Sequence, residues 1–189
     1  MMSDKSWICV VYYTPNYSGE ASKLKDSMDS LDLPYYMEVI ENKGGWDKNT
    51  HYKPTFIRKC LDMFPEKDIV YVDADATFEH YPELFDVLEC DIAYWVNTYP
   101  NKSRHQLATG TLFFANNDAT RRICDGWIKE CADEDYEILE QDKLKKALRF
   151  LDNILSFVLP VEYCAIFDHP TIKNVVPVIK HYQASRRLK

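Results

Sequence analysis

The sequence predicts an α/β fold: a single domain in which a mostly parallel central sheet is flanked by helices. Short runs rich in β-branched and aromatic residues alternate with longer segments of helical periodicity, as in a sheet whose strands are joined by crossover helices. The length of 189 residues suits one such domain, which we expect to span residues 1–189. Apolar residues make up 46% of the chain, which is enough for a packed core and excludes a disordered protein.

The first half of the chain is expected to form three strands and two helices. An apolar run at residues 8–13 ends at a Thr-Pro-Asn turn, which is typical of a buried strand. Helical periodicity follows at residues 19–31 and again at residues 54–64, where Pro54 occupies the first turn. The other expected elements of this half are strands at residues 35–40 and 68–72 and a loop at residues 43–47.

The second half continues the same alternation. Residues 92–96 and 110–114 are expected to form strands, and residues 119–132 and 140–150 to form helices. A last strand is expected at residues 175–179. No internal repeat or low-complexity segment interrupts this pattern, which supports one domain.

The charge balance and the cysteines argue against several classes of protein. The formal net charge of −7 gives no broad footprint for duplex nucleic acid, which requires clustered Lys and Arg. The six cysteines form no C-x-x-C pair and lie in apolar runs, so we expect buried, reduced thiols rather than a zinc site or a disulfide framework. No apolar stretch approaches the length of a membrane span, and the N-terminus lacks the apolar core of a signal peptide. We therefore expect a cytoplasmic protein without a membrane span.

Two aspartates at the end of the strand at residues 68–72 are the sharpest chemical feature. Asp73 and Asp75, separated by Ala74, follow this strand directly, where open α/β sheets place their ligands. Paired carboxylates are hard oxygen ligands for Mg²⁺ or Mn²⁺ and leave coordination positions for diphosphate oxygens. The plain alternative is that both residues solvate a loop or cap the next helix.

A strand that ends in D-x-D at Asp73, well inside an α/β domain, resembles the arrangement in GT-A glycosyltransferases such as glycogenin and the bacterial lipopolysaccharide galactosyltransferases. The resemblance implies a metal-dependent enzyme that transfers a sugar from a nucleotide-diphosphate-sugar, with a UDP-sugar favoured, to an acceptor hydroxyl. The likeness to glycogenin-type enzymes also implies retention at the anomeric carbon. The chain is shorter than those enzymes, so the acceptor stays open among saccharide, lipid-linked, protein and modified-base DNA hydroxyls.

Further segments carry the same resemblance and suggest site residues. Glu140-Gln141-Asp142 looks like the acidic-Gln-Asp segment near the reacting carbon, which makes these residues the catalytic candidates. A charged first turn of a helix is the alternative. His181, expected just after the last strand, looks like the third metal ligand of many GT-A enzymes, and Arg186 could meet the diphosphate. We expect this tail to be loose until metal and nucleotide bind.

The donor-binding candidates lie on both sides of the D-x-D. Gly110 looks like the small residue beside the sugar pocket, where the missing side chain lets backbone approach the donor. The others, by the resemblance, are Tyr12, Tyr13 and Thr14 for the base and ribose, Asn49 and Lys53 for nucleotide or phosphate, and Asp73, Ala74, Asp75 and Arg186. Core packing of one tyrosine and a solvated loop at residues 46–54 are the plain alternatives.

Two other functions compete with this one. Asp73-x-Asp75-x-Thr77 also matches the nucleophile motif of haloacid-dehalogenase phosphatases, although their motif normally follows the first strand. A non-catalytic nucleotide-sugar binding module would use the same metal and diphosphate contacts.

Overall fold

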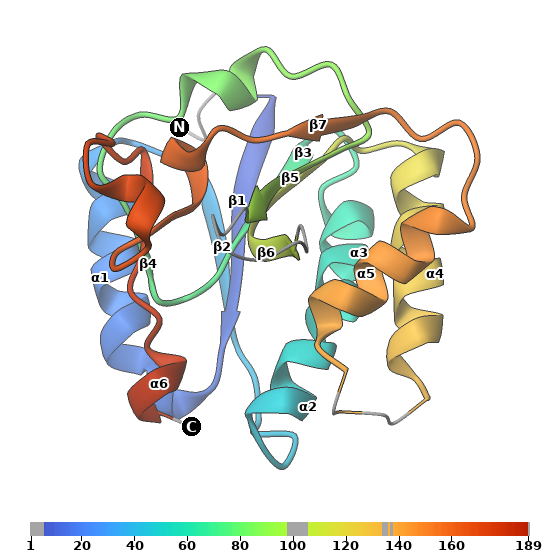
Figure 1. Cartoon of the computed structure of the whole chain (residues 1–189), viewed down its shortest axis with the longest axis horizontal. Helices are drawn as coiled ribbons and strands as arrows, with labels where there is room; N and C mark the ends of the chain where they lie inside the picture. The colour runs from blue at the N-terminus through green and yellow to red at the C-terminus, as the bar shows by residue number, and fades with distance from the viewer. Residues whose placement is uncertain (1–5, 98–105, 134–135, 137, 189) are drawn as a thin grey trace.

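The central sheet has six strands, five of which point the same way. It runs through the middle of the molecule with helices on either side (Figure 1). The computed structural model describes residues 6–97, 106–133, 136 and 138–188. The strands are β1 (Trp7–Tyr13), β2 (Tyr35–Val39), β3 (Asp68–Val72), β5 (Ile92–Asn97), β6 (Gln106–Phe114) and β7 (Ser156–Val158). Their spatial order is β2-β1-β3-β6-β5-β7, and β6 runs antiparallel to both of its neighbours. The expected mostly parallel sheet is confirmed.

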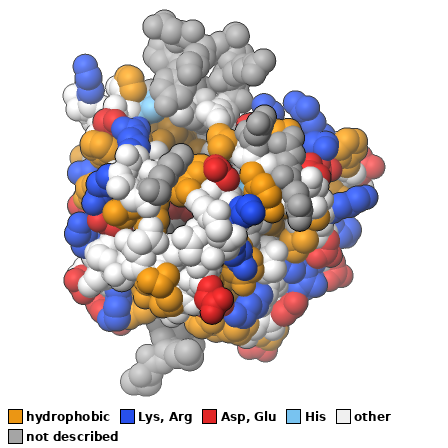
Figure 2. Space-filling view, turned by 90° about the horizontal axis from the view of Figure 1, so that it is seen from below, with side chains coloured by type: hydrophobic (Ala, Val, Ile, Leu, Met, Phe, Trp, Pro, Cys, Tyr) orange, Lys and Arg blue, Asp and Glu red, His pale blue; other side chains and the backbone are white. Residues whose placement is uncertain are grey.

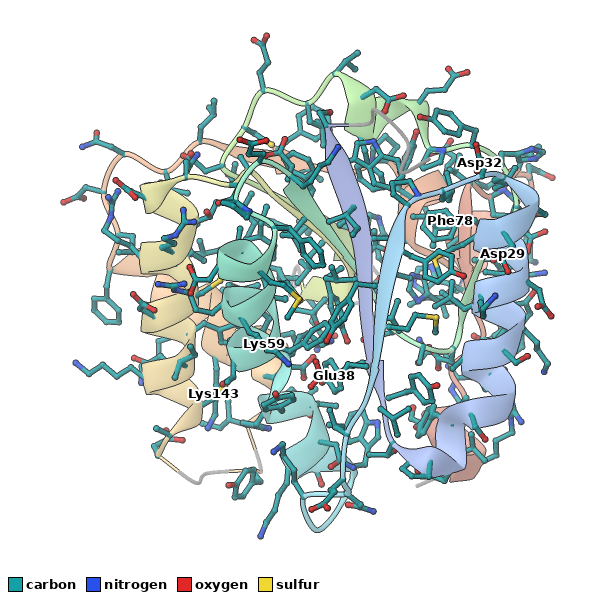
Figure 3. All side chains as sticks on the ribbon, turned by 180° about the vertical axis from the view of Figure 1, so that it is seen from behind. Asp29, Asp32, Glu38, Lys59, Phe78 and Lys143 are labelled. Carbon is teal, nitrogen blue, oxygen red and sulfur yellow. The ribbon has the colours of Figure 1, made fainter. Side chains whose placement is uncertain are left out.

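Helices cover both faces of this sheet. Successive residues of β1 alternate between two buried clusters, with Cys9 and Val11 in one and Ile8 and Val10 in the other. The first cluster packs against α1 (Ser18–Ser30), and Phe78 lies between the sheet and this helix (Figure 3). The second packs against α3 (Lys53–Met63), α4 (Asp118–Cys131) and α5 (Glu140–Arg149).

The expected last strand starts later than predicted and belongs to a second, small sheet. It contains β4 (Ala76–Phe78), β8 (Ala165–Ile166) and β9 (Ile179–His181), in the order β4-β9-β8. The strand expected at residues 175–179 begins only at Ile179, because Pro177 has no N–H for a ladder and Val176 is 68% exposed. His181 therefore lies inside a strand rather than after one.

Other element boundaries differ in smaller ways. β6 starts at Gln106, before the expected residue 110, and α2 (Trp46–His51) overlaps the expected loop at residues 43–47. α2 has only six residues and no side-chain cap, and it begins after Gly45, whose φ of 139° suits glycine. Such a helix leaves little periodicity in the sequence. The short remaining elements are η1 (Pro15–Tyr17), η2 (Glu83–Asp86), η3 (Val161–Cys164), η4 (Pro170–Ile172) and α6 (Ser185–Leu188).

The six cysteines are all buried, and none forms a disulfide. This confirms the expectation of free, buried thiols. Within the described ranges, no helix is both long and apolar enough to cross a membrane.

Candidate active site

A cavity of about 570 Å³ opens where β1 and β3 end. Figure 2 views the molecule from below Figure 1, the side on which α2 and α6 lie, and red carboxylates appear near the middle of this face among apolar side chains. The predicted residues that line the cavity are Tyr12, Tyr13, Thr14, Asn49, Lys53, Asp73, Ala74, Asp75, Gly110, Glu140, Gln141, His181 and Arg186. Asp142 does not line it and is exposed on α5.

Asp73, Asp75 and His181 form a cluster in this cavity that could hold a metal ion. One potential ligand atom of each residue lies within 4.8 Å of those of the other two. The pairing of β4 with β9 brings them together, because it sets Ala76 opposite His181. Two carboxylates and an imidazole are a set of ligands that suits a divalent metal ion.

Burial and mutual repulsion tune the ionisation of this cluster. Burial, followed by the charge of Asp73, raises the pKa of Asp75 to about 6, while a hydrogen bond of 2.6 Å from the Ala184 N–H to Asp75 Oδ2 acts in the opposite direction. Burial lowers the pKa of His181 to about 4, so its imidazole is neutral at neutral pH and can act as a ligand. A bound cation would stabilise two neighbouring carboxylates that otherwise repel each other.

Gly110 makes room for the imidazole of His181. A Cβ atom at this position would lie 3.0 Å from His181 Cε1, closer than ordinary side-chain contacts allow. The Gly110 carbonyl also accepts a hydrogen bond of 2.9 Å from the Asp73 N–H, which fixes the start of the D-x-D turn. Glycine is thus needed here for contact with a protein side chain, in addition to any approach by a donor.

Lys53 lies beneath the site rather than at its mouth. Its ammonium is 3.1 Å from Asp73 Oδ1, 3.1 Å from Glu140 Oε1 and 3.1 Å from the Thr109 carbonyl, and the side chain is 2% exposed. Burial lowers the pKa of Lys53, but the charges of Asp73 and Glu140 raise it by more, so the lysine stays charged. The Thr109 hydroxyl oxygen lies 3.2 Å away as well, so four protein oxygens surround its three N–H donors, which favours a role in holding these carboxylates over the expected phosphate contact.

The predicted base- and ribose-binding residues at the end of β1 line the cavity and differ in exposure. Tyr12 is 8% exposed, and its hydroxyl donates a hydrogen bond of 2.8 Å to the Asn49 carbonyl, so it is largely a core residue. Tyr13 is only partly buried. The Thr14 hydroxyl donates to Asn16 Oδ1 at 2.6 Å, which shapes the turn after β1. These positions agree with the alternation of side chains along a strand.

The C-terminal tail is tied to the body of the protein, in contrast to the expected loose end. Arg186 pairs with Asp168, and Arg187 pairs with Glu20 at 2.7 Å. The Tyr182 N–H also donates to the Asp75 carbonyl at 2.9 Å. The tail and the D-x-D turn therefore form one hydrogen-bonded unit.

The cavity residues that the sequence did not indicate include two with buried polar atoms that lack a hydrogen-bond partner among the described residues. These atoms are the hydroxyl of Tyr17 and Oδ1 of Asn97. Tyr17 follows the predicted first strand after a short turn, and this position could have indicated it as a site residue. Asn97 ends β5 and carries no local signal beyond its polarity.

The fold matches solved glycosyltransferases, whereas no protein-family model matches the chain and no curated protein matches it significantly. A glycosyltransferase involved in glycosylation of the major capsid of PBCV-1 superposes with a TM-score of 0.69 at 12% identity, covering 95% of this chain and 96% of that one. The chain has the GT-A fold. The glycosyltransferase GlyE of Streptococcus pneumoniae TIGR4 matches with a TM-score of 0.64 at 15% identity, over 95% of this chain and 55% of that one.

The galactosyltransferase LgtC, solved with donor and acceptor sugar analogues, matches with a TM-score of 0.58 at 10% identity, over 93% and 87% of the two chains. These matches confirm the fold that the D-x-D segment suggested. They also remove the haloacid-dehalogenase alternative, because that phosphatase motif belongs to another fold.

Proposed function

We propose that this protein is a glycosyltransferase that binds a nucleotide-diphosphate-sugar, with a UDP-sugar favoured, through Mn²⁺ or Mg²⁺. The observation that carries the proposal is the cluster of Asp73, Asp75 and His181 inside the cavity of a GT-A fold. Three protein ligands leave coordination positions for diphosphate oxygens. The bound cation would neutralise the diphosphate leaving group.

The protein's own side chains would orient the donor sugar. Glu140 Oε1 accepts hydrogen bonds from Lys53 at 3.1 Å and from the Thr109 hydroxyl at 2.6 Å, so this carboxylate has a fixed position. Gln141 lines the same cavity. We assign sugar binding to Glu140 and the face of the reacting carbon to Gln141, with retention of configuration. We assign Asp142 no contact with the sugar, because it does not line the cavity.

A hydroxyl acceptor completes the proposal. LgtC was solved with sugar analogues as donor and acceptor, which supports a saccharide as the first acceptor to test. The chain covers only 55% of GlyE, so parts of that protein have no counterpart here.

A panel of nucleotide-sugars tests the function. A ligand that binds only the folded state raises its stability, so one nucleotide-sugar should raise the Tm in the presence of Mn²⁺ and not in the presence of a chelator. Release of nucleoside diphosphate from that donor should accelerate when saccharide acceptors are added. Donor binding without acceptor-dependent release would indicate the non-catalytic binding module instead. The absence of any stabilising nucleotide-sugar would refute the proposal.

A further inference from the structure

Thr111 contacts the imidazole that the metal site would use. Its hydroxyl oxygen lies 2.8 Å from His181 Nε2, and both side chains are almost completely buried. The other ring nitrogen lies on the side of the Asp73 carboxylate: a Cβ atom built on Gly110 would lie 3.2 Å from His181 Nδ1 and 3.5 Å from Asp73 Oδ2, so both atoms border the same small space. With Nε2 engaged by Thr111, Nδ1 is the nitrogen available to a cation.

The position of one proton decides whether Nδ1 can act as a ligand. A neutral imidazole carries a single N–H, and only the other nitrogen has a lone pair for a metal. His181 can bind a cation through Nδ1 only if its proton is on Nε2 and is donated to Thr111. A hydroxyl can accept from Nε2, and metal-binding histidines generally donate their other ring N–H to such a partner, so the 2.8 Å contact favours donation from Nε2 to Thr111.

Cys164 is a further neighbour of Thr111. Burial raises the pKa of its thiol to about 12, and hydrogen bonds from the backbone and side chain of Thr111 act to lower that pKa. The thiol sulfur is a weak acceptor, so the threonine hydroxyl can donate a hydrogen bond to it while the threonine oxygen accepts one from Nε2.

We propose that Thr111 is a positioning residue that holds His181 in the tautomer protonated on Nε2 and so presents the Nδ1 lone pair to the divalent cation. The inference rests on the proposed function, because that function supplies the cation. Partners of this kind fix the tautomer and ring orientation of metal-binding histidines in general. In the sequence, Thr111 appears only as a β-branched residue within an apolar strand, which explains why it drew no attention there.

The tautomer can be measured directly in the metal-free wild-type protein. Nitrogen-15 spectra of histidine-labelled protein near neutral pH distinguish a protonated from an unprotonated ring nitrogen, and His181→Gln identifies the signals of this residue among the five histidines. We expect a protonated Nε2 and an unprotonated Nδ1. A proton on Nδ1 would overturn the inference without reference to any variant.

Metal affinity provides the second test. Thr111→Val keeps the shape of the side chain and removes the hydroxyl, and it should weaken Mn²⁺ binding in the presence of uridine diphosphate by about 10–100-fold. Thr111→Ser keeps the hydroxyl and should restore most of the affinity in calorimetric titrations. If wild-type protein binds Mn²⁺ and Thr111→Val binds it equally well, this inference alone is wrong. If wild-type protein binds no Mn²⁺ with any nucleoside diphosphate, the proposed function itself fails.

Discussion

Lys53 offers the sharpest test of the site's architecture, because one buried ammonium is shared by two carboxylates. Lys53→Met keeps the length of the side chain and removes its charge, which leaves Glu140 buried with an uncompensated charge. Breaking a buried ion pair costs about 3–5 kcal/mol. The Glu140 side chain is 7% exposed, but that of Asp73 is 36% exposed and partly screened by water, so we take the lower end, about 3 kcal/mol.

The measurement is the free energy of unfolding in urea near neutral pH, without added metal. A loss of about 3 kcal/mol corresponds to a decrease in Tm of about 6–12 °C for a chain of this size. Because its two partners raise the pKa of Lys53 overall, its contribution is fully present below the ordinary lysine pKa of about 10.4 and is lost only at higher pH. Neutral pH therefore reports the whole effect.

Lys59→Met is the matched control. Lys59 pairs with Glu38 on the surface, where Figure 3 shows the two side chains close together, and they are 42% and 21% exposed. An exposed pair of this kind contributes about 0–1 kcal/mol. If Lys53→Met costs no more than Lys59→Met, the ammonium does not hold the site together and the account of Lys53 is wrong.

Three further predictions concern the metal and the donor. Gly110→Ala should displace the His181 ring and weaken Mn²⁺ binding about 10-fold or more, as measured by calorimetry. Circular dichroism should show little change in fold, and an unchanged Mn²⁺ affinity would contradict the argument that glycine makes room for the His181 ring. Since the pKa of Asp75 is raised to about 6, protons compete with the cation there, and Mn²⁺ affinity should fall as the pH decreases through about 6; affinity that is flat down to pH 5 would exclude this effect. Proton NMR of the first product should show a retained anomeric configuration. Inversion would contradict the assignment of Gln141 to the face of the reacting carbon.

The D-x-D segment was predictable because its signal is local. An apolar strand followed directly by Asp73 and Asp75 needs no knowledge of distant residues, and β3 ends where the sequence predicts. The helices α1, α3, α4 and α5 were likewise predictable from their periodicity, each within about two residues of the expected bounds.

The remainder of the site depends on contacts that the sequence does not encode locally. Lys53 stands in a polar stretch that suggests solvent exposure, but it meets Glu140, 87 positions away, in the interior. The start of α5 shows another feature that the sequence motif alone did not predict. Consecutive helical residues point about 100° apart, so Glu140 and Gln141 line the cavity while Asp142 does not. His181 was predicted as a metal ligand only from the family resemblance, because a strand as short as β9 has no clear alternation of apolar and polar residues.

Nucleoside-diphosphate binding by the paired carboxylates tests the central claim most directly. Calorimetric titration of uridine diphosphate should show binding to wild-type protein with Mn²⁺ and much weaker binding with a chelator. Asp73→Asn and Asp75→Asn should each abolish the difference between the two conditions, with circular dichroism confirming that both variants are folded. Metal-dependent affinity that survives in both variants would show that these aspartates do not hold the ion, and the proposed glycosyltransferase mechanism would be contradicted.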